Sequence, residues 1–402
     1  MTVYRFTGRN IQGVMEKGTI EADSKQIAIK KLRDRGINPR QIDESKSILH
    51  RDLSLGKAMK NEDFVIYCRQ FATLIRAGIS IVEATHILAD QTSSKGLKKA
   101  LKGVEEDIRS GIAFSTAAAK YPKIFPVLFV NMMKAGEATG NLDETLDRMA
   151  FSYEKSFKLK KKIQSAMSYP IVLVILIILV SAFMLLWLVP QFTANFANFG
   201  AELPAITLMV LGFSNALKTY WWIFLLIGGA IIGAFLYLYQ KNPKFNFYVH
   251  YLLLKMPIFG KVLQKSAIAR MTRTLASLFS SSVPILNALS IVQKIIGDPV
   301  IEEVVHKSRT SLEKGSSLAE PLKESWVFPP LVTQMVSIGE QTGSLDYMLE
   351  KIAEFYEDDV DRTVDSLKAL IEPIMIILLA GIVGFIMAAV LLPMYSLYEQ
   401  VG

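Results

Sequence analysis

Three long runs without a charged side chain set the strongest constraint on how this chain of 402 residues can fold. The runs cover residues 171–189, 222–239 and 374–392. An α-helix rises about 1.5 Å per residue, so each run nearly crosses a hydrocarbon core of roughly 30 Å. A helix that is apolar on every side needs lipid or protein all around it. We therefore predict three transmembrane helices, over residues 170–190, 221–239 and 373–393.

The overall composition fits a few membrane spans attached to water-soluble domains. Hydrophobic residues make up 51% of the chain and charged residues 20%, which is apolar for a soluble protein but too polar for a chain buried in lipid throughout. The net charge of +8 would suit either nucleic acid or a membrane surface. The basic residues flank apolar segments without aromatic interleaving or a basic domain face, so no direct nucleic-acid contact is expected. The single cysteine, Cys68, excludes an internal disulfide and a cysteine-based metal cluster.

The placement of lysine predicts which side of the membrane each segment occupies, because cytoplasmic segments carry an excess of basic residues. Lysines precede the first span and follow the second: Lys158, Lys160, Lys161 and Lys162, then Lys241, Lys244, Lys255, Lys261 and Lys265. Between these two spans the only charged residues are Glu202 and Lys218. No signal-peptide pattern occupies the N-terminus. We predict a multi-pass protein of the cytoplasmic (inner) membrane, with its N-terminus cytoplasmic and its C-terminal tail outside.

The chain contains an internal duplication. Residues 132–154 align without a gap with residues 335–357, and eleven positions are identical. The same offset pairs Pro170 with Pro373. The repeat unit is therefore a helical domain that ends in a span, and the second span returns the chain to the same side. Apolar residues recur at helical spacing and predict about six helices per copy, with a long helix that starts at Leu142 and continues toward the first span.

The first 45 residues differ, because they alternate like strands around one helix and predict a small α/β appendage. The predicted fold class is mainly α: a duplicated cytoplasmic helical-bundle domain, three transmembrane helices and this appendage. Besides the spans, the predicted segments are the appendage at residues 1–45, a linker at 46–60, the first repeat at 61–169, an external loop at 191–220, the second repeat at 240–372 and an external tail at 394–402.

Features of transporters and enzymes are missing from the sequence. A transporter or channel normally carries ionisable groups at membrane depth, and these spans have none. No phosphate-cradling GxxxxGK[ST] loop is present, the four histidines are dispersed, and no catalytic constellation stands out. Gly229 and Gly233 in the second span, and Gly381 and Gly384 in the third, would let helices approach closely, although glycine is common in membrane helices. A non-enzymatic scaffold is the main prediction, and a transporter or channel subunit is the alternative.

Two copies of one motif carry a resemblance to a known family. The motif residues are Gly136, Glu137, Thr139 and Gly140 in the first copy and Gly339, Glu340, Thr342 and Gly343 in the second. With the Phe-Pro pairs before each motif and the three-span layout, the chain resembles the type II secretion system F protein family. That resemblance implies a non-enzymatic, self-associating platform in the inner membrane for type IV pilus, type II secretion or competence machines. The implied partners are a hexameric assembly ATPase, pilin or pseudopilin subunits, other inner-membrane machine components and membrane lipid.

The motif admits two interpretations. In the first it is structural: glycines permit positive φ, the threonines bond local backbone, and the glutamate favours the positive end of the helix that follows. In the second, Glu137 binds a divalent cation such as Ca²⁺ together with Glu83 and Asn141, since calcium prefers oxygen ligands. The second copy has Asn287 and Ser344 instead of Glu83 and Asn141, so such a site would exist only in the first. No other cofactor is predicted.

Charge differs between the repeats just before the first and third spans. The first copy has Lys158, Lys160, Lys161 and Lys162, and the second has Asp358, Asp359, Asp361 and Asp365. Both sets lie roughly 12–24 Å before the corresponding proline if the helix is continuous. They could pair within one chain or between subunits, or they could be two solvated faces. Exposed pairs contribute at most about 1 kcal/mol each, so pairing would specify register more than stability.

Overall fold

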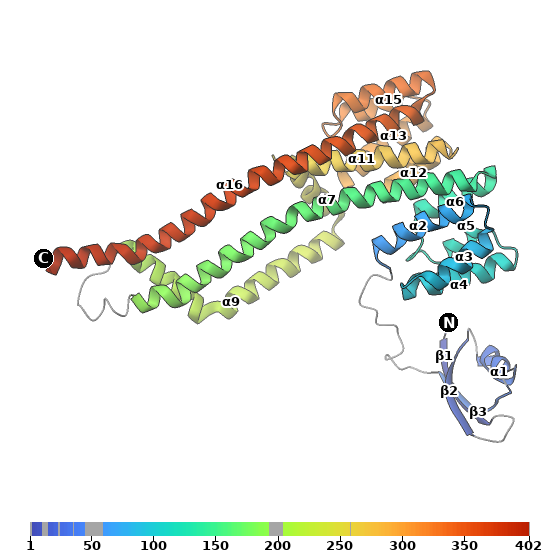
Figure 1. Cartoon of the computed structure of the whole chain (residues 1–402), viewed down its shortest axis with the longest axis horizontal. Helices are drawn as coiled ribbons and strands as arrows, with labels where there is room; N and C mark the ends of the chain where they lie inside the picture. The colour runs from blue at the N-terminus through green and yellow to red at the C-terminus, as the bar shows by residue number, and fades with distance from the viewer. Residues whose placement is uncertain are drawn as a thin grey trace. The chain divides into compact units, whose positions relative to one another are not determined.

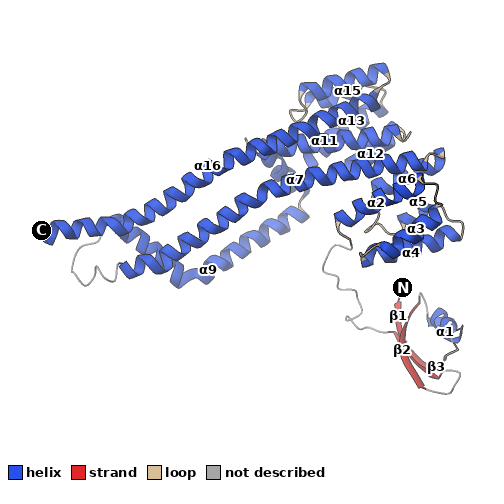
Figure 2. Cartoon of the chain, viewed as in Figure 1, coloured by secondary structure: helices blue, strands red, loops and turns tan. Residues whose placement is uncertain are grey.

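The computed structural model describes residues 2–9, 15–22, 25–34, 36–44, 59–192, 204–257 and 259–401. The chain divides into two compact units, Met1–Ala58 and Met59–Gly402, and each is described here by itself. Among the described residues, strands occur in the first unit and the second is helical (Figures 1 and 2). Most of the predicted linker, and residues 193–203 of the predicted external loop, lie outside the described residues.

The first unit is a three-stranded antiparallel sheet with one helix. Its elements are β1 (Thr2–Arg9), β2 (Met15–Ala22), α1 (Lys25–Asp34) and β3 (Asn38–Glu44). Strand β1 is central and pairs with both others. Side chains alternate across a strand, so Tyr4 and Phe6 fall on one face, where they form a core with Ala28, Leu32 and Ile42. This is the expected α/β appendage.

The second unit contains the duplication as two matching sets of six helices within the described ranges. The first set is α2 (Asn61–Arg76), α3 (Ile81–Gln91), α4 (Lys95–Arg109), α5 (Phe114–Ala119), α6 (Val127–Thr139) and α7 (Leu142–Phe183). The second set is α11 (Phe259–Ser280), α12 (Ile285–Ile295), α13 (Pro299–Glu313), α14 (Ala319–Glu324), α15 (Pro330–Thr342) and α16 (Leu345–Val401). Between the sets lie α9 (Ala205–Lys241) and α10 (Pro243–Lys255). The predicted fold class is confirmed.

The core of the first repeat is a stack of buried aromatic rings. Tyr67 stacks on Phe71 with ring centroids 5.5 Å apart, and Phe71 stacks on Phe114 at 5.2 Å. In the second repeat the positions of Tyr67 and Phe71 hold Met271 and Leu275, which are also buried. The two copies therefore keep the same helices around cores of different chemistry. Cys68 lies in the first core, and burial raises the pKa of its thiol well above the usual range.

Within the described residues, three helices are long and apolar enough to cross a membrane: Leu142–Phe192, Ala205–Lys241 and Leu345–Leu392. Each contains one of the three predicted spans, and the first and third continue directly from the helical repeats (Figure 1). Residue 205 already begins a helix inside the expected external loop, and α9 breaks at Tyr220, where φ is −113° and ψ is 17°. The expected external tail is also helical, because α16 continues to Val401.

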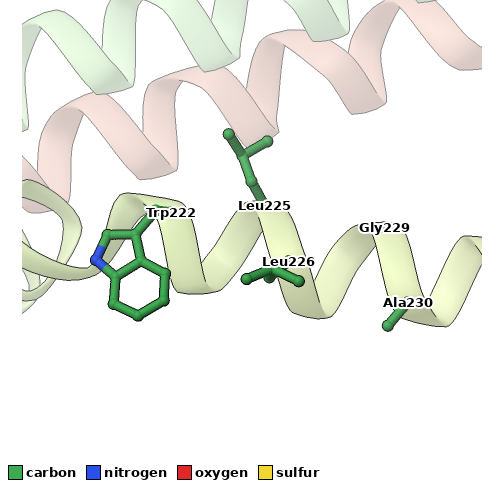
Figure 3. Close-up of a pocket in the computed structure, with 5 residues that line it drawn as sticks. All are labelled: Trp222, Leu225, Leu226, Gly229 and Ala230. Atoms are coloured by element: carbon green, nitrogen blue, oxygen red, sulfur yellow. The ribbon is translucent and has the colours of Figure 1, made fainter.

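Among the described residues, the glycine pairs of the spans make no close contact with another helix of the chain. A Cβ atom added at Gly229, Gly233, Gly381 or Gly384 would meet no heavy atom within 4 Å. Figure 3 shows Gly229 on an exposed apolar face of α9, together with Trp222, Leu225, Leu226 and Ala230. The predicted close packing at these glycines therefore does not occur between the spans of one chain.

Two hydroxyl groups of α9 bond main-chain carbonyls that prolines leave open. Thr207 Oγ1 donates to the carbonyl of Ala389 at 2.7 Å. In a regular α-helix that carbonyl would accept from the amide four residues on, but residue 393 is proline and has no N–H. Ser214 Oγ donates to the carbonyl of Leu185 at 2.5 Å, within the π-helical turn η2 (Met184–Leu188).

The π-helical turn explains why the carbonyl of Leu185 is open. Val189 donates its N–H to the carbonyl of Met184, five residues back. In the same pattern the carbonyl of Leu185 would accept from an N–H of residue 190. Residue 190 is the matching proline of the first repeat. Lipid offers no water to pair an open backbone carbonyl, so both hydroxyls have a structural role. Residues 205–219 therefore hold together the ends of the first and third spans that lie away from the repeats.

We expect Thr207→Val and Ser214→Ala each to destabilise the folded protein by about 1 kcal/mol, the usual size of a hydrogen bond between membrane helices. The midpoint of thermal unfolding in one detergent measures the effect. Ser181→Ala is the matched control, because Ser181 Oγ is buried without a hydrogen-bond partner among the described residues. A loss in the control as large as in the two variants would contradict the assignment.

Candidate functional site

The two repeats meet along a charged seam formed by α7, α11 and α16. These three helices lie side by side in Figure 1, and each contacts the other two. We define the seam as residues 151–162 of α7, 265–273 of α11 and 350–365 of α16. It lies just before the first and third spans. The lysine set of the first repeat and the aspartate set of the second occur in the same stretch.

Each repeat ties its first helix to its last with an arginine–glutamate clamp. Arg69 donates from Nε and Nη2 to the two carboxylate oxygens of Glu154, at 2.6 and 2.7 Å. Arg273 makes the same pair of bonds to Glu357, at 2.8 and 3.0 Å. Such two-pronged bonds fix direction as well as distance. The hydrogen bonds from Arg69 lower the pKa of Glu154, so the first clamp is complete at neutral pH.

The second clamp is buried because the first repeat covers it. The Arg273 side chain is 5% exposed, whereas that of Arg69 is 37% exposed. The ring of Phe151, from α7, has its centroid 5.4 Å from the guanidinium carbon of Arg273, a cation–π distance. Lys155, one turn on, places Nζ 3.5 Å from Glu357. Residues of both repeats therefore build the second clamp.

We expect Arg273→Met to cost about 3 kcal/mol of folding stability, because it leaves the carboxylate of Glu357 buried without its main partner. Arg69→Met should cost no more than about 1 kcal/mol, since its clamp is open to water. Thermal unfolding of the two variants in the same detergent gives the comparison. Equal losses would show that cover by the first repeat does not strengthen the second clamp.

The lysine and aspartate sets meet at one point of the seam. Lys162 Nζ lies 3.1 Å from Asp361 and 3.4 Å from Asp365. Burial by itself would lower the pKa of Lys162, but the two carboxylates together raise it. The other lysines and aspartates of the two sets do not pair with one another in the described ranges. Lys161 is 3.8 Å from Glu62, Asp359 is 2.8 Å from Lys265, and Lys158, Lys160 and Asp358 have no ion pair among the described residues.

The pairing of Lys162 predicts a charge-reversal rescue. Lys162→Asp should lower the stability of the folded chain by placing three carboxylates together, and adding Asp361→Lys and Asp365→Lys should restore it, because opposite charges then face each other again. The midpoint of thermal unfolding in detergent is the readout. Lys160→Asp, a reversal with no partner in the seam, is the control. Failure of the triple variant to recover would argue against pairing within the chain.

The motif glutamates anchor a short helix in each repeat. Both carboxylate oxygens of Glu137 accept from Ser115, one from its backbone N–H at 3.1 Å and one from its hydroxyl, in the first turn of α5. Glu340 accepts from the hydroxyl of Ser317 at 2.6 Å and from the N–H of Leu318 at 2.8 Å, just before α14. The expectation that the glutamate serves the following helix is wrong, because it lies in the last turn of α6 or α15 and reaches across to another helix.

The other motif residues end α6 and α15. Gly140 and Gly343 have φ of 76° and 71°, in the left-handed region that suits glycine. Thr139 and Thr342 donate to carbonyls of the preceding turn at 3.0 and 2.8 Å. Gly136 is buried, and a Cβ there would lie 3.0 Å from a threonine hydroxyl of α7. The first motif glycine and its counterpart in the second repeat thus allow close helix packing, while the last glycine allows the turn.

The three residues of the predicted calcium site are not joined by any hydrogen bond or ion pair in the described ranges. Glu137 accepts hydrogen bonds from Ser115. Glu83 is exposed on α3, and Asn141 is exposed just before α7. Across the same residues, no group of three histidine, cysteine, aspartate or glutamate side chains is arranged to hold a metal ion. Calcium binding by this set stays a prediction of the sequence.

Comparison with known proteins assigns the chain to a family. The model for type II secretion system protein F matches twice, at residues 67–190 and 271–393, and the model for the N-terminal domain of that protein matches residues 1–43. The chain belongs to the type II secretion system protein F family. Both matches of the repeated domain end at the prolines, residues 190 and 393, which leave the carbonyls of Leu185 and Ala389 open, so the family unit includes its span.

Relatives within this family match the chain over nearly its whole length. The type IV pilus assembly protein PilC of Thermus thermophilus is 40% identical over 401 residues, 99% of this chain and 98% of that protein. PilC of Myxococcus xanthus is 39% identical over 399 residues, 98% of this chain and 94% of that protein. The type II secretion system protein F of Vibrio cholerae is 30% identical over 401 residues, 99% of this chain and 98% of that protein.

Proposed function

We propose that this member of the protein F family is a non-enzymatic platform in the inner membrane for assembly of type IV pilus or pseudopilus fibres. The observation that carries the proposal is the full-length match to relatives named for pilus assembly and secretion. The architecture supports it, because two copies of one family domain are each built onto a membrane-spanning helix.

The geometry suits the transfer of a displacement from cytoplasm to membrane. Helix α7 has 42 residues and α16 has 57, and each carries the last helix of a repeat and a span without a joint. The arginine clamps fix the first helix of each repeat to these rods. A push on either cytoplasmic repeat is therefore passed along a stiff helix to the bilayer, where pilin-like subunits would leave the membrane.

The energy for such a displacement would come from another protein. The chain has no phosphate-binding loop of the GxxxxGK[ST] type. A cytoplasmic hexameric ATPase is the proposed source, with self-association and other inner-membrane components completing the platform. The proposed orientation, with both repeats cytoplasmic and residues 191–220 and 394–402 outside, follows the lysines beside the spans.

Co-purification with an assembly ATPase tests the proposal. The tagged full chain, extracted in mild detergent from cells that assemble the fibre, should retain the ATPase and pilin-like subunits. A tagged inner-membrane protein of similar size with three spans is the control for non-specific capture. Absence of the ATPase, combined with solute flux through liposomes that contain the chain, would overturn the proposal in favour of a transporter.

A further inference from the structure

Helix α10 begins directly after the second span ends. Asn242 alone separates it from α9, and the Asn242 side chain accepts from the N–H groups of Lys244 and Phe245 as an N-cap. One face of α10 belongs to the second repeat: Leu254 is buried in its core, and the helix contacts α11 and α13. The helix is therefore held in a fixed position relative to the span.

Side-chain contacts place α10 beside the last turns of that span. The rings of Phe245 and Phe235 meet edge to face, with centroids 5.6 Å apart. Tyr239 Oη lies 3.0 Å from Nε2 of His250, whose other ring nitrogen lies 3.2 Å from Asp298. Phe235 and Tyr239 belong to the uncharged run that crosses the hydrocarbon, so α10 lies where hydrocarbon gives way to lipid headgroups.

The other face of α10 is an uncovered apolar stripe. Tyr248 is 70% exposed and Leu252 69% exposed, and Met256 follows at the same helical spacing just after the helix. Lys244 and Lys255 are exposed near the two ends of the stripe. Apolar side chains between lysines are typical of a helix that lies in the membrane interface.

A neighbouring tryptophan extends this apolar surface. Trp326, from the segment between α14 and α15, is half exposed and contacts Tyr251 of α10 edge to face at 5.5 Å. Lys255 Nζ lies 4.6 Å from the Tyr251 ring and 5.7 Å from the Trp326 ring. Tryptophan and tyrosine favour the headgroup region, where their rings are apolar and their polar edges meet water.

The charged residues of α10 and of the chain segments next to it are all basic, and the acidic neighbour Asp298 comes from the start of α13, where it contacts His250. The sequence contains no aspartate or glutamate between Glu202 and Asp298. Lysines at 241, 244, 255 and 261 surround the stripe within that interval. Basic residues next to a membrane are attracted to anionic headgroups. The charge therefore favours an acidic lipid surface over the zwitterionic one that the apolar stripe alone would accept.

We propose that α10 is an interfacial helix that seats the second repeat on anionic lipid. Tyr248, Leu252 and Met256 insert among the outer acyl-chain carbons, and Lys244 and Lys255 contact headgroup phosphates. Because α10 also packs on α11 and α13, the second repeat is fixed at the bilayer surface. The inference concerns lipid contact alone and does not depend on the proposed function.

Depth-dependent fluorescence quenching of the full chain tests this proposal. Cys68→Ala removes the native thiol, and Leu252→Cys carries an environment-sensitive NBD dye. The matched control carries the dye at Lys99→Cys, an exposed position on α4. Both proteins are placed in nanodiscs of phosphatidylcholine, with or without phosphatidylglycerol, that contain lipid with a nitroxide close to the headgroup. We expect the dye at position 252 to be quenched several-fold more than the dye at position 99.

The lysines supply the second arm of the test. Phosphatidylglycerol should increase quenching at position 252, and Lys244→Gln with Lys255→Gln should abolish that increase. Lys99→Gln with Lys102→Gln, on exposed α4 positions, should leave it unchanged in the Leu252→Cys protein. Equal quenching at positions 252 and 99 overturns the proposal, as does indifference to phosphatidylglycerol. If the dye at position 252 is protected from quenching only in discs that hold two copies of the chain, the stripe contacts a second copy instead of lipid.

Discussion

The continuity of α7 and α16 between water and lipid is the constraint on which the rest of the structure depends. A bilayer leaves no water to pair backbone groups, so a span must be an unbroken helix or have its open groups satisfied by a neighbour. Here the same helices also form the last element of each soluble repeat. Pro170 lies inside α7 and removes one helical hydrogen bond, yet the helix continues for its full length. Each repeat is therefore joined to its span by one continuous helix.

The shared residues of the duplication fold each repeat, and the residues that differ join the two repeats. The arginine clamps make the same bonds in both copies, and the motif glutamate of each copy accepts hydrogen bonds at the start of its own short helix. At the seam, the first copy has Phe151, Lys155 and Lys162, where the second has Glu354, Asp358 and Asp365. Two identical surfaces would bring like charges together, whereas these diverged ones give a ring over Arg273 and a lysine between two aspartates. The asymmetry specifies one way of placing the copies against each other.

The sequence was sufficient to predict the spans, the duplication and the long helix from Leu142, because each depends on a pattern repeated over many residues. It was not sufficient for contacts between distant helices. Arg69 and Arg273 occupy matching positions of the two copies, and so do Glu154 and Glu357. The sequence therefore contained both residues of each clamp, in two separate parts of the repeat. Their pairing requires knowing that α2 lies on α7. The partner of Glu137 was likewise hidden, since Ser115 lies 22 residues earlier in another helix.

Helix α9, the candidate span that lies outside the two repeats, joins the other two spans. The duplicated prolines at 190 and 393 leave an open carbonyl near the end of each rod that lies away from the repeats. No residue of the same rod bonds either carbonyl by side chain in the described ranges. Thr207 and Ser214 are two helical turns apart on α9, so their hydroxyls project from the same face and reach both rods. The seam joins the rods beside the helical repeats, and α9 joins them at the far end. Because the two contacts lie at opposite ends of α7 and α16, together they resist both separation and relative rotation of the rods.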